Sequence, residues 1–295
     1  MADFTGDTNI HLIARQGSFF EVIKEHSYKC KLPSPHKGSF LYIALDGNKP
    51  RVDDFLDLLL EHLAQYVYPV KDPDMTREQV FRKAAKRFSR NPKSGEVGEL
   101  ILYLILECVF QAPQLVAKIR LKTASPDMVK RADAIHVRAE SGKLIIYFGE
   151  SKVHAKLGPA ISSALDSLKK YITNDSAMDD DILTVEDHAH ILTEHKKEFA
   201  EYLNPYKESE VRREFVYPLF IAFDTEIYSA LLAMSPEEAG EYFAKKYCED
   251  IQEAEEKFMA KVEEKALGNI NLVMLLLPFH SVEELRTKFI NKLNE

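Results

Sequence analysis

Apolar residues follow two patterns along this chain, one with the spacing of helices and one of short continuous runs. The continuous runs, bounded by turn residues, predict buried strands over residues 40–45, 215–223 and 270–277. Helical spacing predicts four amphipathic helices, over residues 52–66, 75–90, 159–171 and 282–293, and a long charged helix over residues 235–267. Thr76 is a candidate N-cap for the helix over 75–90. The pattern indicates an α/β fold.

The middle of the chain has a definite order of elements. Residues 96–110 are apolar nearly all round, which predicts a buried helix. Residues 115–121 alternate like a half-exposed strand, and two more strands, a helix and a further strand follow. The order of helix, three strands, helix and strand predicts a mixed sheet with helices on its faces.

The second and third of these strands flank Ser141-Gly142, which has the composition of a tight hairpin turn. If this pair is a two-residue loop, counting back along both arms places Asp133 opposite Glu150. Because strand side chains alternate between faces, Lys152 projects from the same face as Glu150. The pattern therefore predicts that two carboxylates and a lysine converge at the open end of the hairpin.

This set of groups suits a divalent metal site for phosphodiester hydrolysis. Mg²⁺ prefers hard oxygen ligands and keeps several waters, so Asp133, Glu150 and the Ser151 carbonyl would suffice to hold it. A bound Mg²⁺ activates water and neutralises charge in the transition state. Lys152 would orient or deprotonate the attacking water, or stabilise developing negative charge. The alternative is a set of exposed charges at a strand end, because acid-x-Lys triplets are common.

A further carboxylate is expected from the preceding helix. Four polar residues form a narrow stripe on this otherwise apolar element: Glu96, Glu99, Tyr103 and Glu107. Carboxylates are seldom buried unless they are paired or bound to metal. Glu99 lies deeper in the helix and is the first candidate for catalysis, whereas Glu96 is a metal ligand or a charge that stabilises the helix N-terminus. The alternative is that the stripe meets solvent or pairs with arginines.

The formal net charge of −8 is unevenly distributed. Residues 71–95 hold eight basic and three acidic residues, whereas residues 175–210 hold eleven acids and three lysines. The basic segment predicts either a nucleic-acid-binding face or an ordinary solvated helix. Four cations are candidate contacts to DNA phosphates, with solvent exposure as the alternative for each: Lys83, Arg87, Lys156 and Lys169.

Composition also bears on cellular location. The three cysteines are far apart and lack metal-ligand spacing, which indicates reduced thiols. The acidic N-terminus is unlike a secretory signal, and the longest apolar runs are too short to cross a bilayer. We therefore expect a cytoplasmic protein without a membrane partner.

The segments Gly95-Glu96-Val97-Gly98-Glu99, Asp133 and Glu150-Ser151-Lys152 resemble the motifs of the PD-(D/E)XK nuclease superfamily, with Ala132 in place of the usual proline. The resemblance implies a restriction-endonuclease-like core from about residue 95 to 223. The whole chain also resembles the HamA family, the small subunits of the Hachiman antiphage defence system, through the segments RADAIHV, GESK and FLYIALDG. The breaker-rich run over residues 91–95 is the best candidate for a domain boundary. With the resemblance, it divides the chain into an N-terminal α/β region with a basic helix, residues 1–92, and a nuclease core with C-terminal helical additions, residues 93–295.

The resemblance also implies a function. It suggests a DNA endonuclease that needs Mg²⁺, with Mn²⁺ able to substitute, and that has little sequence specificity. The implied partner is a superfamily 2 helicase, HamB, which would restrain the nuclease within a hetero-oligomer. One alternative is a non-catalytic, nuclease-like subunit that docks on the helicase through residues 175–210 and 235–267. A nuclease that acts on RNA is another, because the metal chemistry is shared.

Overall fold

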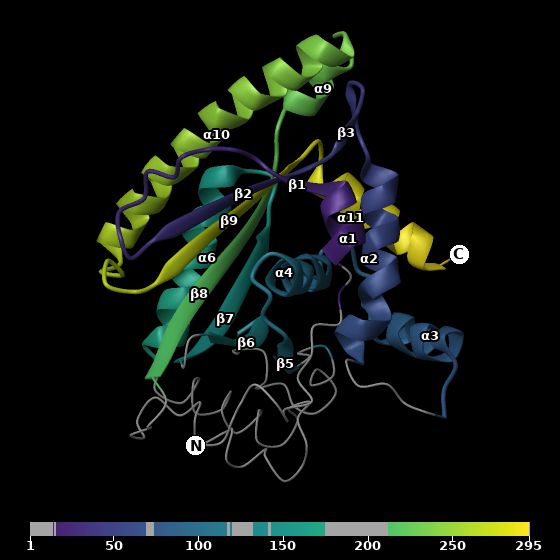
Figure 1. The fold of residues 1–295 in the computed structure, drawn as a ribbon, viewed down its shortest axis with the longest axis horizontal. Helices are drawn as coiled ribbons and strands as arrows, with labels where there is room; N and C mark the ends of the chain where they lie inside the picture. The colour runs from purple at the N-terminus through teal and green to yellow at the C-terminus, as the bar shows by residue number, and fades with distance from the viewer. Residues whose placement is uncertain are drawn as a thin grey trace.

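A seven-stranded mixed sheet forms the centre of the molecule (Figure 1). The computed structural model describes residues 14, 16–68, 74–116, 119, 132–140, 143–174 and 212–294. The strand order is β1-β2-β9-β8-β7-β6-β5, with β1 (Ile23–Glu25), β2 (Lys37–Ile43), β5 (Gln114–Val116), β6 (Ala134–Glu140), β7 (Lys143–Val153), β8 (Arg212–Asp224) and β9 (Leu272–Phe279). A separate two-stranded sheet joins β3 (Leu45–Asp46) to β4 (Lys49–Pro50).

The central strands run parallel and the outer ones antiparallel. Strands β2, β9, β8 and β7 are parallel neighbours, while β6 pairs antiparallel with β7 and β5 antiparallel with β6. On the other edge, β1 pairs antiparallel with β2. All eight residues of β9 are buried, as expected for a central parallel strand covered on both faces. The predicted mixed sheet with helices on its faces is confirmed.

Helices cover both faces of the sheet (Figure 1). One face carries α1 (Gln16–Val22), α2 (Val52–Val67), α4 (Glu96–Cys108) and α11 (Val282–Asn294), and α3 (Arg77–Arg87) packs beside α2. The other face carries α6 (Leu157–Ile172), α9 (Ile227–Leu231) and α10 (Pro236–Glu264). The alternating side chains of β7 divide between the two layers: Ile145 and Tyr147 pack towards α4, and Ile146 and Phe148 towards α6.

Most predicted elements are confirmed, with ends that differ by a few residues. Thr76 is the N-cap of α3, and its hydroxyl accepts a hydrogen bond from the Gln79 amide in a capping box. Of the strand predicted over 115–121, residues 115 and 116 lie in β5, whereas residue 119, which the structure also describes, is helical. The short elements α1, β1 and α9 were not predicted, because three to seven residues carry too little periodicity to stand out.

The predicted hairpin register is confirmed. Glu140 pairs with Lys143, and the pairs continue without a slip to Ala134 and Gly149. Ser141 and Gly142 themselves lie outside the described residues. Apolar alternation on both arms fixes this register, since a one-residue slip would turn every side chain to the wrong face.

The predicted boundary between residues 92 and 93 lies in the loop between α3 and α4. The sheet nevertheless continues across it, because β1 and β2 come from the N-terminal region and β2 pairs with β9. No helix in the described part of the chain is long and apolar enough to span a membrane.

Candidate functional site

The site predicted from the sequence lies at a fork in the sheet, where β6 ends and β7 continues. The last β6–β7 pair is Ala134 with Gly149, whereas β7 stays paired with β8 as far as Val153. Residues 150–153 therefore have a strand neighbour on one side only. The main-chain groups on their other side face the fork.

Asp133 fills the start of this fork. Its amide donates to the Gly149 carbonyl at 2.9 Å, so it does not form a regular pair with Glu150. Its Oδ2 instead accepts hydrogen bonds from the amide of Ser151 at 2.9 Å and from the Ser151 hydroxyl at 3.1 Å. A carboxylate thus takes the place of a strand partner. Because the amide and carbonyl of one strand residue point the same way, the Ser151 carbonyl also faces the fork.

Glu150 and Lys152 flank Ser151 on β7 and form an ion pair with each other. Strand alternation directs both towards the face that bears Ile146 and Phe148, while Ser151 faces α4. The Glu150 and Lys152 side chains are 15% and 25% exposed, which leaves the pair partly open to solvent. The structure therefore joins Glu150 to Lys152 as predicted, with the Asp133 carboxylate at the strand edge beside them rather than across from Glu150.

Helix α4 brings two more carboxylates to the α4 side of the fork. Gly98 makes this approach possible, because a Cβ at this position would lie 2.7 Å from Val153 Cγ2 and 3.2 Å from Ser151 Oγ. Glu96 and Glu99, on either side of Gly98, are both buried. Glu96 accepts a hydrogen bond from the Ser89 amide, which ties the end of the α3 segment to the start of α4. The start of α4, which carries both predicted acids, therefore packs against the end of β7.

Tyr66 of α2 completes this acidic cluster and was not singled out in the sequence. Its hydroxyl donates to Glu99 Oε2 at 3.2 Å, and the side chain is fully buried. Burial raises the pKa of Tyr66 well above its ordinary value, and the charges of Glu99, Glu96 and Asp133 raise it further. The carboxylates of Glu99, Glu96 and Asp133 therefore all lie near the Tyr66 hydroxyl. The one signal in the sequence that could have pointed to Tyr66 is its hydroxyl, a polar group on the apolar stripe of the helix predicted over residues 52–66.

Arg286 of α11 is a second residue that the sequence did not reveal. Its Nη2 donates to the Val153 carbonyl at 2.9 Å, on the edge of β7 that faces the fork. Burial lowers the pKa of Arg286, while the charges of Glu283 and Asp224 oppose this shift. The guanidinium fixes the end of the strand that carries Glu150 and Lys152.

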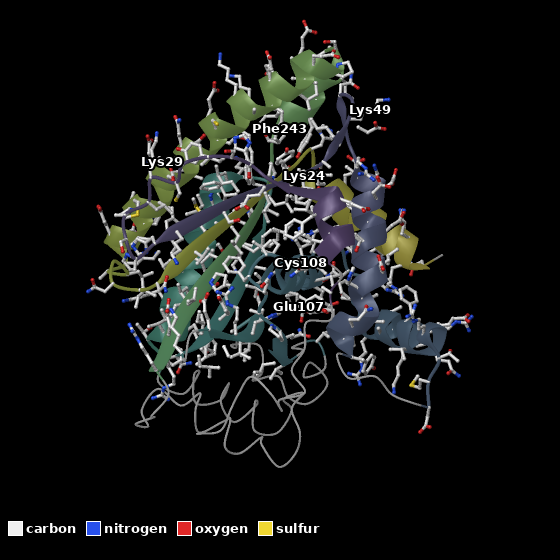
Figure 2. All side chains as sticks on the ribbon, in the orientation of Figure 1. Lys24, Lys29, Lys49, Glu107, Cys108 and Phe243 are labelled. Carbon is white, nitrogen blue, oxygen red and sulfur yellow. The ribbon has the colours of Figure 1, made fainter. Side chains whose placement is uncertain are left out.

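The stripe on α4 is buried rather than exposed to solvent. At its far end lies Glu107, labelled in Figure 2. Its carboxylate accepts hydrogen bonds from the main-chain amides of Ala14 and Gln114 at 3.0 and 3.1 Å. Tyr103 lies between Glu99 and Glu107, and its ring contacts those of Tyr66 and His136. Main-chain donors thus satisfy the Glu107 carboxylate. Its role is structural, and it takes no part in the fork.

The cations predicted to contact DNA lie on two helices, α3 and α6. Lys83 and Arg87 are exposed on α3, and both lie over the ring of Tyr68, 5.4 and 5.9 Å from its centre. The Arg87 Nε also donates to the Tyr68 hydroxyl at 2.8 Å. Lys156 is exposed at the N-cap of α6, and Lys169 is half-buried in its last turn. The acidic segment 175–210 lies outside the described residues.

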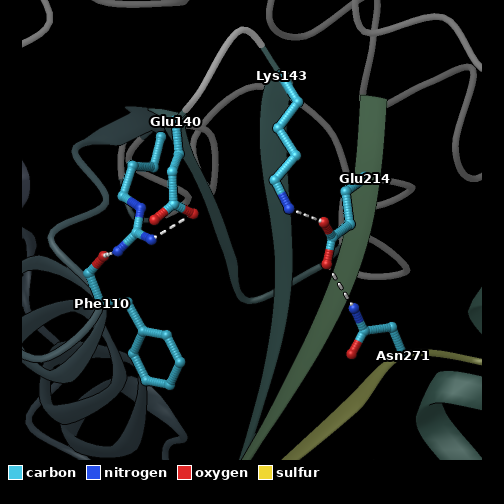
Figure 3. A network of polar contacts seen from close by, with 6 residues as sticks. Phe110, Glu140, Lys143, Glu214 and Asn271 are labelled. Atoms are coloured by element: carbon cyan, nitrogen blue, oxygen red, sulfur yellow. Dashed lines mark hydrogen bonds and ion pairs between the residues drawn. The ribbon is translucent and has the colours of Figure 1, made fainter. Parts of the chain in front are cut away.

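The opposite end of β7 offers a useful contrast (Figure 3). Lys143 forms an ion pair with Glu214 of β8, and Glu214 also accepts a hydrogen bond from Asn271. The hydrogen bond that Lys143 donates to Glu214 is the main cause of the lowered pKa of Glu214. This second Lys–Glu pair joins the start of β7 to β8, at the opposite end of β7 from the fork.

The donor atoms at the fork fit a hard cation. They are carboxylate and carbonyl oxygens, the ligands that Mg²⁺ prefers, and the carboxylates that act jointly on Tyr66 show negative charge gathered beside them. Among the described residues, no group of three or more His, Cys, Asp or Glu side chains is arranged as a ready metal site. The groups at the fork that could hold Mg²⁺ are Asp133, Glu150 and the Ser151 carbonyl, with waters as its remaining ligands.

The comparison with protein families identifies the chain. The HamA family model matches residues 17–293, nearly the whole sequence. The chain belongs to the HamA family. Membership of the HamA family implies a role in Hachiman antiphage defence. The comparison with curated proteins finds no match.

Proposed function

We propose that this HamA-family chain is a metal-dependent DNA endonuclease that acts with a helicase partner and has little sequence preference. The observation that carries the proposal is the fork, where Asp133 bonds to Ser151 and the Glu150–Lys152 ion pair flanks the same residue. The order of the elements around it supports a PD-(D/E)XK core, since α4 precedes β5, β6 and β7, and α6 and β8 follow.

The residues at the fork divide the chemistry between them. Asp133 and Glu150, with the Ser151 carbonyl, would hold Mg²⁺ or Mn²⁺, which when bound makes water more acidic and neutralises phosphate charge. The Lys152 ammonium group, beside Glu150, would orient the attacking water and stabilise negative charge on the phosphate oxygens. Glu99 or Glu96 would take part from the α4 side.

Basic side chains outside the fork would bind the DNA backbone. Lys83 and Arg87 present their charges on an exposed helix, and Lys156 stands at the start of the helix that follows β7. Phosphate contacts of this kind give affinity without reading sequence. The proposed partner is a superfamily 2 helicase of the Hachiman system. This partner is inferred from the HamA family, in which the chain would supply the nuclease subunit.

The proposal is tested by digestion of plasmid DNA with the purified chain. Cleavage should need Mg²⁺ or Mn²⁺ and stop with EDTA. Both Glu150→Gln and Lys152→Ala should lower the rate by at least about 100-fold, the usual loss for a positioned acid–base group. The matched controls are Glu214→Gln and Lys143→Ala, which disrupt the other Lys–Glu pair of β7 (Figure 3) and should leave cleavage unchanged.

Undiminished cleavage by Glu150→Gln and Lys152→Ala would refute the site. An inactive wild-type chain that still binds the helicase would favour the non-catalytic docking subunit. Parallel digests of RNA separate the remaining alternative, because a ribonuclease would degrade RNA and spare the plasmid.

A further inference from the structure

We propose that Tyr66 is a positioning residue of the nuclease site, which orients the Glu99 carboxylate towards the fork. The inference rests on the proposed function and adds a residue to it. The starting observation is the hydrogen bond of 3.2 Å from the Tyr66 hydroxyl to Glu99 Oε2. Tyr66 comes from α2, in the N-terminal region, so two parts of the chain would build one site.

Packing leaves the Tyr66 side chain little freedom. It is 1% exposed, and its ring lies 5.4 Å from that of Tyr103. A side chain so enclosed keeps one rotamer, because the surrounding core is close-packed. Its hydroxyl is therefore a fixed donor beside α4.

The chemistry of the two groups sets the direction of the hydrogen bond. A carboxylate oxygen accepts and a phenol hydroxyl donates, so the Tyr66 hydroxyl points its hydrogen at Glu99 Oε2. This leaves Glu99 Oε1 on the side of Gly95, where it lies 3.7 Å from the position of an ideal Cβ.

The consequence for function follows from the position of α4. Gly98 brings the first turn of α4 against Ser151 and Val153, and Glu99 is the next residue of that turn. Groups that orient a metal ligand without touching the metal typically account for about 10-fold to 100-fold in metal affinity or activity. Tyr66 fits this description, since its hydroxyl contacts Glu99.

The test compares Tyr66→Phe with Tyr103→Phe in the full chain. Tyr66→Phe removes the hydroxyl and keeps the ring. Tyr103 is the matched control. It is as buried as Tyr66, its ring packs against that of Tyr66, and its hydroxyl has no hydrogen-bond partner within the described residues. Calorimetric titration with Mn²⁺, without DNA, should show affinity about 10-fold or more weaker for Tyr66→Phe and unchanged for Tyr103→Phe.

A double-mutant cycle gives a readout that a merely structural role would not change. If Tyr66 acts through Glu99, adding Tyr66→Phe to Glu99→Gln should weaken Mn²⁺ binding no further. Should Tyr66→Phe fail to fold, as circular dichroism would show, Glu99→Gln alone must still lose Mn²⁺ affinity.

The outcomes separate this inference from the proposed function. Wild-type affinity in Tyr66→Phe, equal losses in both phenylalanine variants, or additive losses in the cycle would each overturn the role of Tyr66. These results would leave the function standing if Glu150→Gln still abolished cleavage. A wild-type chain that binds no Mn²⁺ would overturn both.

Discussion

Buried polar side chains between α4 and the sheet shape the behaviour of this protein at the scale of single residues. His136 of β6 is fully buried, and its Nδ1 lies 2.7 Å from the Ala112 carbonyl. Since a carbonyl can only accept, Nδ1 carries the proton and the neutral ring leaves Nε2 as an acceptor. Nε2 has no hydrogen-bond partner within the described part of the chain. A second proton on this ring would be placed in an apolar site.

This burial makes stability depend on pH. It lowers the pKa of His136 from 6.5 to about 4, so the unfolded chain binds a proton at pH values where the folded chain does not. The associated stability is present above pH 6.5 and is lost as the pH falls towards 4. Between pH 7 and pH 5 the loss from this group should be about 2 kcal/mol.

Urea unfolding at the two pH values measures this effect. His136→Gln keeps a donor for the Ala112 carbonyl but cannot titrate, so it should lose about 2 kcal/mol less than the wild type between pH 7 and pH 5. Equal losses in the two proteins would show that His136 does not control this step.

Residues of the site differ in how far the sequence reveals them. Glu150 and Lys152 lie at the end of an apolar strand, and period-two alternation is enough to place them together. The hairpin register also brings Asp133 to this end, but its hydrogen bonds to Ser151, in place of a pairing with Glu150, could not be predicted from alternation. Tyr66 sits on an apolar helical stripe, where an aromatic residue is expected in the core whatever its hydroxyl does. Arg286 reaches β7 from an amphipathic helix more than a hundred residues later, so local pattern holds no trace of the contact.

At the scale of elements, the fork depends on how closely α4 packs on β7. Gly98→Ala should disturb this contact, because the new methyl group would lie 2.7 Å from Val153 Cγ2, a stiff branched side chain. Overpacking typically costs about 1–3 kcal/mol, against about 1 kcal/mol gained from the better helix propensity of alanine. The variant should be no more stable than the wild type and should cleave DNA more slowly.

The matched control is Gly240→Ala on α10. A Cβ at Gly240 meets nothing within 4 Å, so only the propensity gain remains, and the variant should be more stable by about 0.5–1 kcal/mol. Thermal unfolding and plasmid digestion of both variants give the comparison. A stabilised, fully active Gly98→Ala would show that α4 and β7 tolerate a wider separation at the fork.

Elements also differ in how well the sequence predicts their pairing. The β6–β7 hairpin is local, and its register follows from a two-residue loop. The pairing of β2 with β9 joins opposite ends of the chain, and a buried parallel strand shows a continuous apolar run that names no partner. This is why the strands themselves could be predicted while the continuity of the sheet across the predicted boundary could not.

At the scale of the whole molecule, the sheet is built from both ends of the chain, and this limits how the protein can be divided. Removing residues 1–92 would expose one edge of β9, which loses its pairs with β2, and would uncover the face of α4 that α1 and α2 protect. It would also remove Tyr66. An uncovered hydrophobic edge strand is a site for aggregation.

We therefore expect residues 93–295 to be insoluble, or to unfold without a cooperative transition, when expressed alone. The full chain should unfold cooperatively under the same conditions, followed by circular dichroism during heating. A separate N-terminal domain would give the opposite result: a soluble 93–295 fragment with a sharp transition, which would show that the β2–β9 pairing contributes little. The distinction bears on the proposed function, because a region 93–295 that needs residues 1–92 to fold could not be released as an active nuclease by proteolysis between the two parts.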